Sequence, residues 1–363
     1  MQRNRFAFAL KDRLVADGVT GNFCFSPLSV DLCLSMLLNG TAGQSKSALA
    51  KTLFLDGTDL RTVNDGNYSL VSALLGNSFT CANSIWTKTS DPLKPDFEDR
   101  IEHFYHGEAF AVPQFDSSVV ARINAWTSDH TKGRIPQILD ELGRTTSVVL
   151  VNALTFDGTW LEPFAPEATT PAQFSVGGKE AATVPTMHLL DRFAYAEAGG
   201  AKAIRMGYQG GKFSMVFILP PANVPATDYL KKLDAKEFAG LLSHAKEQRV
   251  DISLPKFEFR EGYDLVRPLG EMGMAPLFAY ADLSGITNGP GKDSLISQIR
   301  HVTYIKVYEE GTQAAAATAV TAKALAIAPV EPKTFNANRP FLFALMHDDT
   351  DTVVFLGLVN DPR

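Results

Sequence analysis

Cysteine, whose spacing often indicates a disulfide scaffold or a metal cluster, is scarce in this chain. The 363 residues include three cysteines, Cys24, Cys33 and Cys81, and none of them forms a Cys-x-x-Cys pair. An odd number without such spacing excludes a disulfide-based fold and the usual zinc or redox patterns. We therefore expect all three to be small buried hydrophobic residues.

Long basic runs and long apolar runs are also absent. Lys plus Arg number 34 and Asp plus Glu number 40, which gives a net charge of -6 without any extended basic stretch. This balance argues against nucleic acid as a partner. The longest uncharged run, Gly66–Thr87, is interrupted by Asn, Ser, Thr and Gly, so it does not predict a membrane span. Met1–Leu10 lacks the apolar core of a secretory signal, and we expect no signal in this sequence.

The short motifs of common enzyme classes are missing as well. There is no GxSxG, HExxH, GxxxxGK[ST], GxGxxG or EF-hand loop. His103 and His106 lack a third ligand nearby and are interpreted as solvated histidines at a helix end. The acidic group Asp348, Asp349 and Asp351 is more typical of a solvated turn than of a calcium site. The missing motifs argue against an enzyme without excluding one, and we expect no metal site.

Hydrophobic periodicity predicts helices early in the chain and strands later. Ser26 followed by Pro27 has the form of an N-cap and a first helical residue, in a helix that Gly40 ends. Val148–Phe156 is almost continuously β-branched and apolar, as a strand buried on both faces requires. Further helices are predicted at Phe6–Leu14, Ala48–Leu55, Phe97–Tyr105, Val119–Lys132, Ala226–Ser243 and Tyr263–Met272, and strands at Phe213–Leu219, Val250–Phe259, Leu295–Tyr308, Pro340–Met346 and Thr352–Val359. This order indicates an α+β fold with large antiparallel or mixed sheets.

One segment near the C-terminus has an unusual composition. Two acids, Glu309 and Glu310, precede the run from Gly311 to Ala322, which holds no charge, no proline and no aromatic residue. An exposed loop is normally richer in polar and turn residues, and a core helix has large apolar residues at helical spacing. The composition alone fits an exposed loop, an Ala-rich helix or an inserted strand with one small-residue face.

An ordered series of short motifs extends from Asn22 to Pro362. It comprises Asn22–Ser29, Asn124–Trp126, Thr131–Gly133, Val149–Leu154, Gly158–Trp160, Val184–Met187, Leu254–Phe257, Tyr263–Leu265, Gly273–Met274, Ala281–Gly285, His301, Glu309–Ala317, Phe335–Phe343 and Phe355–Val359. Each motif is weak alone, but their order and spacing together are specific. In this series the chain resembles the serpins, the large inhibitors of serine proteases.

The resemblance implies a single serpin domain over residues 1–363, with three β-sheets, about eight or nine helices and an exposed reactive-centre loop at about 309–335. A target protease would attack this loop and form an acyl-enzyme, and the cut loop would then insert into the main sheet. Inserting ~14 residues at ~3.3 Å each would move the protease by about 46 Å and distort its catalytic geometry. The implied inhibitor is a monomer that needs no cofactor.

The resemblance also assigns roles to residues that are far apart in the sequence. The hinge, which enters the sheet first, would be Glu309, Glu310, Gly311, Thr312, Gln313, Ala314, Ala315, Ala316, Ala317 and Thr318. The breach, where the hinge enters, would be Trp160, Lys256 and Glu309. The shutter, under the centre of the main sheet, would be Ser26, Ser29, Asn152 and His301. Outside the family context, Glu309 would be a solvated charge, and Trp160 and His301 would be core residues. We expect Thr312 to lie near the surface before cleavage.

The reactive bond follows from counting along the loop. Seventeen residues from the first hinge acid through the residue before the cut is the usual family spacing, and this count places the bond at Leu325-Ala326. Leucine would fill an apolar pocket, so chymotrypsin-, elastase- or subtilisin-like proteases are the expected targets. The alternative is Lys323-Ala324, which suits a trypsin-like protease.

Two residues depart from the family pattern, and two other functions compete with inhibition. Asp157 stands where a lysine is usual, and Tyr308 replaces a frequent asparagine, but neither alters the small-residue hinge. A non-inhibitory serpin that acts as a binding or chaperone module would be expected to carry charged, bulky or proline residues in the hinge. A hydrolase would need a nucleophile and base that the sequence does not show. An extracellular location is expected for the family, although three free thiols leave the cytoplasm open.

Overall fold

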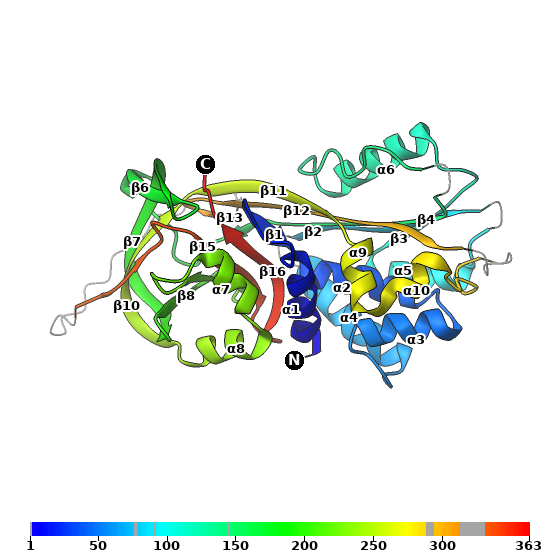
Figure 1. The fold of residues 1–363 in the computed structure, drawn as a ribbon, viewed down its shortest axis with the longest axis horizontal. Coiled ribbons are helices and arrows are strands. Elements are labelled where there is room, and N and C mark those ends of the chain that lie inside the picture. The colour runs from blue at the N-terminus through cyan, green and yellow to red at the C-terminus, as the bar shows by residue number, and fades with distance from the viewer. Residues whose placement is uncertain (1, 76–78, 90–91, 144–145, 288–293, 313–330) are drawn as a thin grey trace.

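The computed structural model describes residues 2–75, 79–89, 92–143, 146–287, 294–312 and 331–363 (Figure 1). Its α-helices are α1 (Gln2–Leu14), α2 (Pro27–Leu38), α3 (Gly43–Thr52), α4 (Leu60–Leu75), α5 (Pro95–Tyr105), α6 (Ser117–His130), α7 (Ala226–Lys232), α8 (Ala235–Ser243), α9 (Val266–Leu269) and α10 (Ala275–Ala279). A π-helical turn, Gly270–Met274, joins α9 to α10, so the described residues form nine separate α-helical segments. A short 3-10 helix occupies Pro166–Ala168.

Five strands form the sheet that is here called the main sheet. In spatial order they are β11 (Phe257–Asp264), β12 (Ile296–Val307), β4 (Val148–Phe156), β2 (Phe79–Lys88) and β3 (Glu108–Val112). β12 and β4 run parallel, whereas β11 and β2 are antiparallel to these neighbours. Figure 1 shows α6 on one face of this sheet and α2, α4 and α5 on the other. All nine residues of β4 are buried because helices cover both faces.

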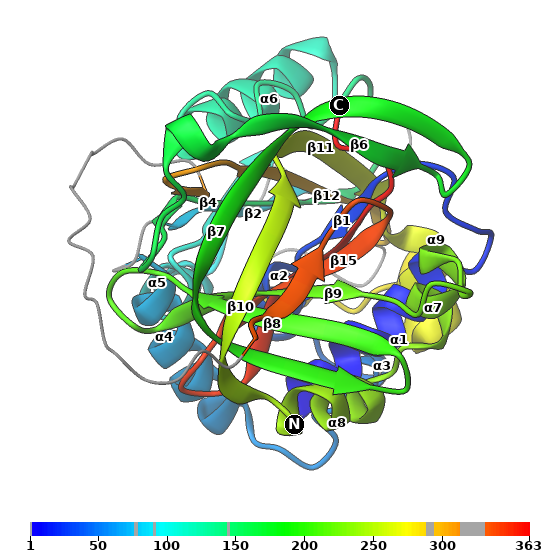
Figure 2. The same ribbon diagram turned by 90° about the vertical axis from the view of Figure 1, so that its left-hand side faces the viewer.

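A larger sheet of nine strands packs beside the main sheet. Its strands are β1 (Phe23–Phe25), β16 (Thr352–Val359), β15 (Phe341–His347), β9 (Phe213–Leu219), β8 (Ala201–Gly207), β7 (Glu180–Ala198), β10 (Lys246–Pro255) and β14 (Lys333–Asn336), with β6 (Thr170–Val176) paired to β7. Figure 2 faces this sheet. The long strand β7 pairs in turn with β6, β10 and β8. A third sheet has two short strands, β5 (Gly158–Thr159) and β13 (Gly311–Thr312).

Two hydrophobic cores lie on the two faces of the main sheet. The larger core extends from Phe6 in α1 to Val359 in β16 and fills the space between the sheets and α2. The smaller core lies under α6, where Ile123 packs with Val149 and Val151 of β4. Alternate residues of β4 therefore serve the two cores, as the period-2 geometry of a strand requires.

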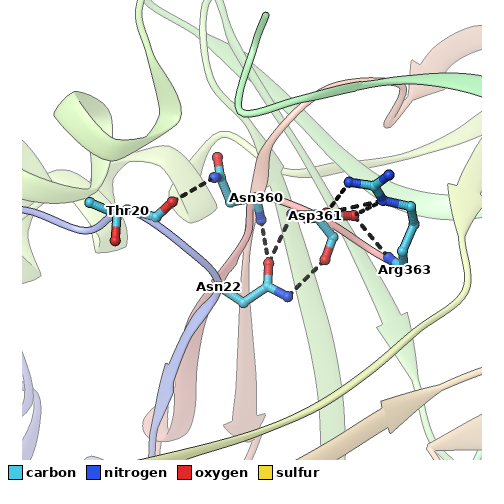
Figure 3. A network of polar contacts seen from close by, with 5 residues as sticks. All are labelled: Thr20, Asn22, Asn360, Asp361 and Arg363. Carbon is cyan, nitrogen blue, oxygen red and sulfur yellow. Dashed lines mark hydrogen bonds and ion pairs between the residues drawn. The ribbon is translucent and has the colours of Figure 1, made fainter. Parts of the chain in front are cut away.

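The two ends of the chain are joined where β1 pairs with β16. The Asn22 side chain accepts hydrogen bonds from the backbone N–H groups of Asn360 (2.8 Å) and Asp361 (2.9 Å), and it donates one to the Asp361 carbonyl (2.7 Å). Figure 3 shows this network, in which the Asn360 side chain also donates to the Thr20 carbonyl. Asn22, the first residue of the motif series, thus fixes the start of β1 against the end of β16.

Several predicted elements are confirmed. α2 begins at Pro27 with Ser26 as its N-cap. The Ser26 Oγ accepts a hydrogen bond from the Ser29 N–H group at 3.2 Å. The predicted strands Val148–Phe156, Phe213–Leu219 and Thr352–Val359 match β4, β9 and β16 residue for residue. The predicted α+β class with three sheets is likewise confirmed.

Other element predictions were wrong. Tyr263 lies in β11, so the helix predicted at Tyr263–Met272 begins only at Val266. The predicted helix Ala226–Ser243 divides into α7 and α8, with Asp234 as the N-cap of the second. Val250–Phe259 divides between β10 and β11, which belong to different sheets. Sequence reasoning missed α4, because Asn, Asp, Gly and Ser dilute its apolar pattern, and β2, whose partner β4 is distant in sequence. It also missed β3 and the consecutive antiparallel strands β6–β8.

Candidate functional site

The hinge begins where β12 ends, and its first residues are already paired with the sheet. Gly311 and Thr312 form β13, antiparallel to Thr159 and Gly158 of β5, which directly continues the line of β4. A Cβ atom on Gly311 would lie 2.0 Å from the Gly158 carbonyl oxygen, so this approach requires glycine at position 311. The start of the hinge therefore lies beside the upper end of β4, meaning the end at Phe156.

Thr312 is buried, which corrects the expectation that it lies near the surface. Its side chain is 1% exposed, and its Oγ1 is 2.6 Å from the hydroxyl oxygen of Tyr208. Burial raises the pKa of Tyr208 well above its usual value, and the hydrogen bond with Thr312 only partly opposes this effect. The expectation failed because it assumed that the loop leaves the sheet immediately after the two acids.

An aromatic pair supports the hinge at the breach. Trp160 is fully buried and stacks on Tyr208, with ring centroids 4.3 Å apart and an interplanar angle of 16°. The Trp160 Nε1–H group donates to the Tyr308 carbonyl at 3.0 Å, and its backbone N–H group donates to the Glu310 carbonyl at 2.9 Å. Trp160 thus holds the backbone on both sides of Glu309.

Glu309 and Lys256 form an ion pair beside this tryptophan. The Lys256 Nζ is 3.0 Å from Glu309 Oε2, and the Thr169 hydroxyl donates to Oε1 at 2.7 Å. Burial opposes ionisation of Glu309, but the hydrogen bonds from Thr169 and Lys256 outweigh it and lower the pKa of this carboxyl group. Lys256 lies between β10 and β11, at the crossing from one sheet to the other. The structure therefore brings the three breach residues, Trp160, Lys256 and Glu309, to one place.

The four shutter residues also lie together, in a fully buried network. The His301 Nε2 accepts a hydrogen bond from the Ser26 N–H group at 2.9 Å, and its Nδ1 is 2.5 Å from Asn152 Oδ1. These partners assign the proton to Nδ1. The Asn152 amide donates to Ser29 Oγ at 2.6 Å. Burial lowers the pKa of His301 to about 3, so the ring is neutral at physiological pH.

Asn83 belongs to the same network and was missed by sequence reasoning. Asn152 Nδ2 donates to Asn83 Oδ1 at 2.5 Å, and Asn83 is 1% exposed. His301, Asn152 and Asn83 are register partners on β12, β4 and β2, so they form one polar row across three strands. The available signal was an asparagine inside the run Cys81–Thr87, where we predicted no strand.

β4 and β12 are in direct contact along most of their length. They pair in parallel from Val148 opposite Ile296 to Thr155 opposite Tyr304. The main sheet thus has five strands, and over this length no strand separates β4 from β12. Beyond Thr155, the next pairing is that of β5 with β13, at the start of the predicted hinge.

Comparisons with known proteins agree with this architecture. A family model described as "Serpin (serine protease inhibitor)" matches residues 1–362. This chain belongs to the serpin family. It is 33% identical to leukocyte elastase inhibitor A of Mus musculus over 373 residues, covering 98% of this chain and 97% of the relative. It is 32% identical to an uncharacterised serpin-like protein of Thermococcus kodakarensis, covering 99% and 85%.

Solved serpin structures give the same result. The crystal structure of tengpin, a thermophilic serpin, in its native state has a TM-score of 0.90 and 31% identity, covering 99% of this chain and 93% of tengpin. Because serpins are protease inhibitors, the protein is not an enzyme. Membership of the family confirms the resemblance on which the site residues were assigned, while their individual roles stay predictions.

Part of the predicted site lies outside the described residues. These positions are the hinge residues Gln313, Ala314, Ala315, Ala316, Ala317 and Thr318, and both candidate reactive bonds, Leu325-Ala326 and Lys323-Ala324. Of the two departures from the family pattern, Tyr308 contacts Trp160 through its backbone carbonyl, so its side chain is not needed for that bond. Asp157 forms an ion pair with Arg134.

Two of the other polar residues singled out in the sequence, Asp348 and His103, contact neighbouring side chains. The Asp348 carboxylate accepts hydrogen bonds from Ser214 (2.6 Å) and Arg205 (2.7 Å) in the turn between β15 and β16. His103 stacks on Tyr68, with ring centroids 5.2 Å apart. No helix in the described part of the chain is long and apolar enough to cross a membrane.

Proposed function

We propose that this serpin inhibits serine proteases as a suicide substrate. The observation that supports this most directly is the pairing of Gly311 and Thr312 with β5, directly above the closed boundary between β4 and β12. The hinge is thereby aligned antiparallel to β4, the orientation in which its following residues would lengthen β13 down the sheet. Cleavage of the loop would free these residues to enter.

The composition of the hinge suits this movement. Thr312 points into the buried interior, so by strand alternation Ala314, Ala316, Thr318 and Val320 would follow it inward. These side chains are small and uncharged, and they need little space over a packed core. A non-inhibitory binding or chaperone module would not require an uninterrupted run of small, uncharged residues from Gly311 to Ala322.

The chemistry would come from the protease. Its serine oxygen would form an ester with the carbonyl carbon of Leu325, the bond to the nitrogen of Ala326 would break, and the new amine would take the proton. Insertion would then displace the protease and disturb its oxyanion hole, so that water does not complete the reaction.

Leu325-Ala326 is the proposed reactive bond, with Lys323-Ala324 as the alternative. The matched relatives include proteins named leukocyte elastase inhibitor, which supports an elastase-like target over a trypsin-like one. We propose that the inhibitor acts as a monomeric single domain without a cofactor. The expected extracellular location is not part of this proposal, because the matched relatives do not support it. Cys24, Cys33 and Cys81 are free thiols, so the protein needs no oxidising compartment.

The test is to mix the protein with elastase, chymotrypsin, subtilisin and trypsin in separate reactions. An SDS-stable complex with the elastase- or chymotrypsin-like enzymes is expected, and mass spectrometry of the released C-terminal peptide should begin at Ala326. Clean cleavage without any stable complex, with all four enzymes, would refute the inhibitory function. A peptide beginning at Ala324 would refute only the assigned bond.

A further inference from the structure

The segment that follows α6 covers the boundary that an inserted strand must open. Ile135, Ile138 and Leu139 are buried and pack in one cluster with Val149 and Val151 of β4 and Val302 of β12. A new strand between β4 and β12 would move these neighbours apart by about one further strand spacing, ~4.8 Å. The contacts of this segment must therefore change before a strand can enter.

Arg134 fixes this segment to the upper end of the boundary. Its guanidinium donates to Thr155 Oγ1 at 3.2 Å and forms an ion pair with Asp157 Oδ2. Its own carbonyl accepts a hydrogen bond from the Arg260 guanidinium. Thr155 and Arg260 are both register partners of Tyr304, on β4 and β11 respectively. Arg134 is thus bound on both sides of β12, at the last paired position below the hinge.

The Arg134–Asp157 ion pair is partly buried and incompletely hydrogen-bonded. The two side chains are 15% and 19% exposed. Burial raises the pKa of Asp157, although Arg134 and Lys132 oppose the rise. Its buried Oδ1 atom has no hydrogen-bond partner among the described residues. A partly buried ion pair with an unsatisfied oxygen adds little to folding stability, so its position deserves a functional explanation.

We propose that Arg134 is a positioning residue that controls when β4 and β12 separate. Its bonds to Thr155 and Asp157, here called the Arg134 bridge, hold the covering segment over the entry point, and they must break before the hinge advances beyond Thr312. The bridge depends on Asp157, the residue at which this chain departs from the lysine usual in the family; a lysine there would repel Arg134. This inference rests on the loop insertion proposed above, whose rate the bridge would set.

The test measures strand entry without a protease. A synthetic peptide with the sequence from Thr312 to Ala322 is incubated with the uncut protein, and uptake is followed by native gel and by intrinsic tryptophan fluorescence. Arg134→Gln and Asp157→Asn should each take up the peptide about tenfold faster, the effect expected for losing a charged hydrogen bond. The double variant should be no faster than the faster single variant, because both changes break the same bridge. Arg134→Lys should restore part of the slow rate.

Two controls separate this role from general weakening of the fold. Arg192→Gln removes an exposed ion pair with Glu247 in the nine-stranded sheet and should leave the uptake rate unchanged. Val63→Ala creates a small cavity in α4, away from the boundary, and should lower the urea midpoint without a comparable change in uptake.

The outcomes distinguish this inference from the proposed function. Uptake by the folded Arg134→Gln and Asp157→Asn variants at the wild-type rate would overturn the role of Arg134 while leaving insertion intact. Equal acceleration by Val63→Ala would also overturn it. Failure of the wild type and all variants to take up the peptide, even on warming, would instead refute insertion itself.

Discussion

At the scale of single residues, the hinge depends on what its first buried positions can hold. Gly311 leaves no room for a side chain, and Thr312 fills a buried site beside the Tyr208 hydroxyl. These contacts exist before any protease has acted. Substitutions here therefore affect the uncut inhibitor as well as the inserted form.

Thr312→Arg should convert the inhibitor into a substrate. In the uncut protein a guanidinium has no partner beside Tyr208, so the arginine should leave this buried site and detach β13 from β5. Insertion would then have to bury the guanidinium at a cost of several kcal/mol, and it would slow while deacylation would not. The measurement is the number of inhibitor molecules consumed per protease molecule inhibited, and the yield of SDS-stable complex should fall at least about tenfold, since a few kcal/mol exceeds one decade in rate. The matched control, Thr312→Val, keeps the shape and should retain most of the complex. Normal complex yield with arginine would contradict the assigned role.

Leu325→Arg should redirect inhibition toward trypsin-like enzymes. The residue before the cut fills the primary pocket of the protease, and a guanidinium there needs a buried acid. Association rates with trypsin-like and elastase-like enzymes should change in opposite directions, each by roughly 100-fold or more, in line with charge-based pocket discrimination. If the wild type already inhibits trypsin better and is cut after Lys323, the assigned register is wrong.

At the scale of secondary-structure elements, one buried polar row crosses three strands of the main sheet. His301, Asn152 and Asn83 join β12, β4 and β2, and Ser26 connects the row to α2. Parting β4 from β12 must break the contact between His301 and Asn152. The row therefore makes the closed sheet sensitive to the protonation of one buried histidine.

The stability of the uncut protein should fall as the pH decreases below ~6.5. Burial lowers the pKa of His301 to about 3. An unfolded histidine titrates near ~6.5, so between these values the unfolded chain binds a proton that the folded protein does not. His301 should then cost up to about 1.4 kcal/mol of unfolding free energy per pH unit. Urea midpoints between about pH 7 and pH 4 measure this slope.

His301→Gln should flatten that slope, because glutamine can keep the contacts with Ser26 and Asn152 without titrating. His244→Gln, at an exposed position after α8, is the matched control and should leave the slope unchanged. The same pH slope in wild type and His301→Gln would exclude His301 as its source.

At the scale of the whole molecule, the proposed function requires the five-stranded main sheet to gain a strand. The uncut protein pairs β4 directly with β12 and places two hinge residues above them. Completing that strand would add backbone hydrogen bonds and bury small apolar side chains. The persistence of the uncut form would then depend on a kinetic barrier.

Cleavage of the loop by a non-target protease should raise the melting temperature. A gain of about 5 kcal/mol on insertion corresponds to roughly 7 °C, because an unfolding entropy of ~2.1 cal/mol/K per residue gives about 0.76 kcal/mol/K for 363 residues. Calorimetry of intact and cleaved protein measures the difference. Cleaved Thr312→Arg serves as the control, since impaired insertion should remove most of the increase. An unchanged midpoint for the cleaved wild type would count against insertion.

The sequence by itself determined the family, the α+β class and the elements with strong local signals, such as α2 with its Ser26–Pro27 start and the apolar strand β4. Through the resemblance to the serpins, it also indicated that Trp160, Lys256 and Glu309 are neighbours. Tertiary structure alone decided that Thr312 is buried, that Asn83 joins the shutter and that Arg134 bridges to Asp157. The physical reason is that these features depend on the register between distant strands. The composition of the small residues after Gly311 fits a loop, a helix or a strand equally well. Only the pairing of β13 with β5 decides that the Thr312 side chain points into the interior.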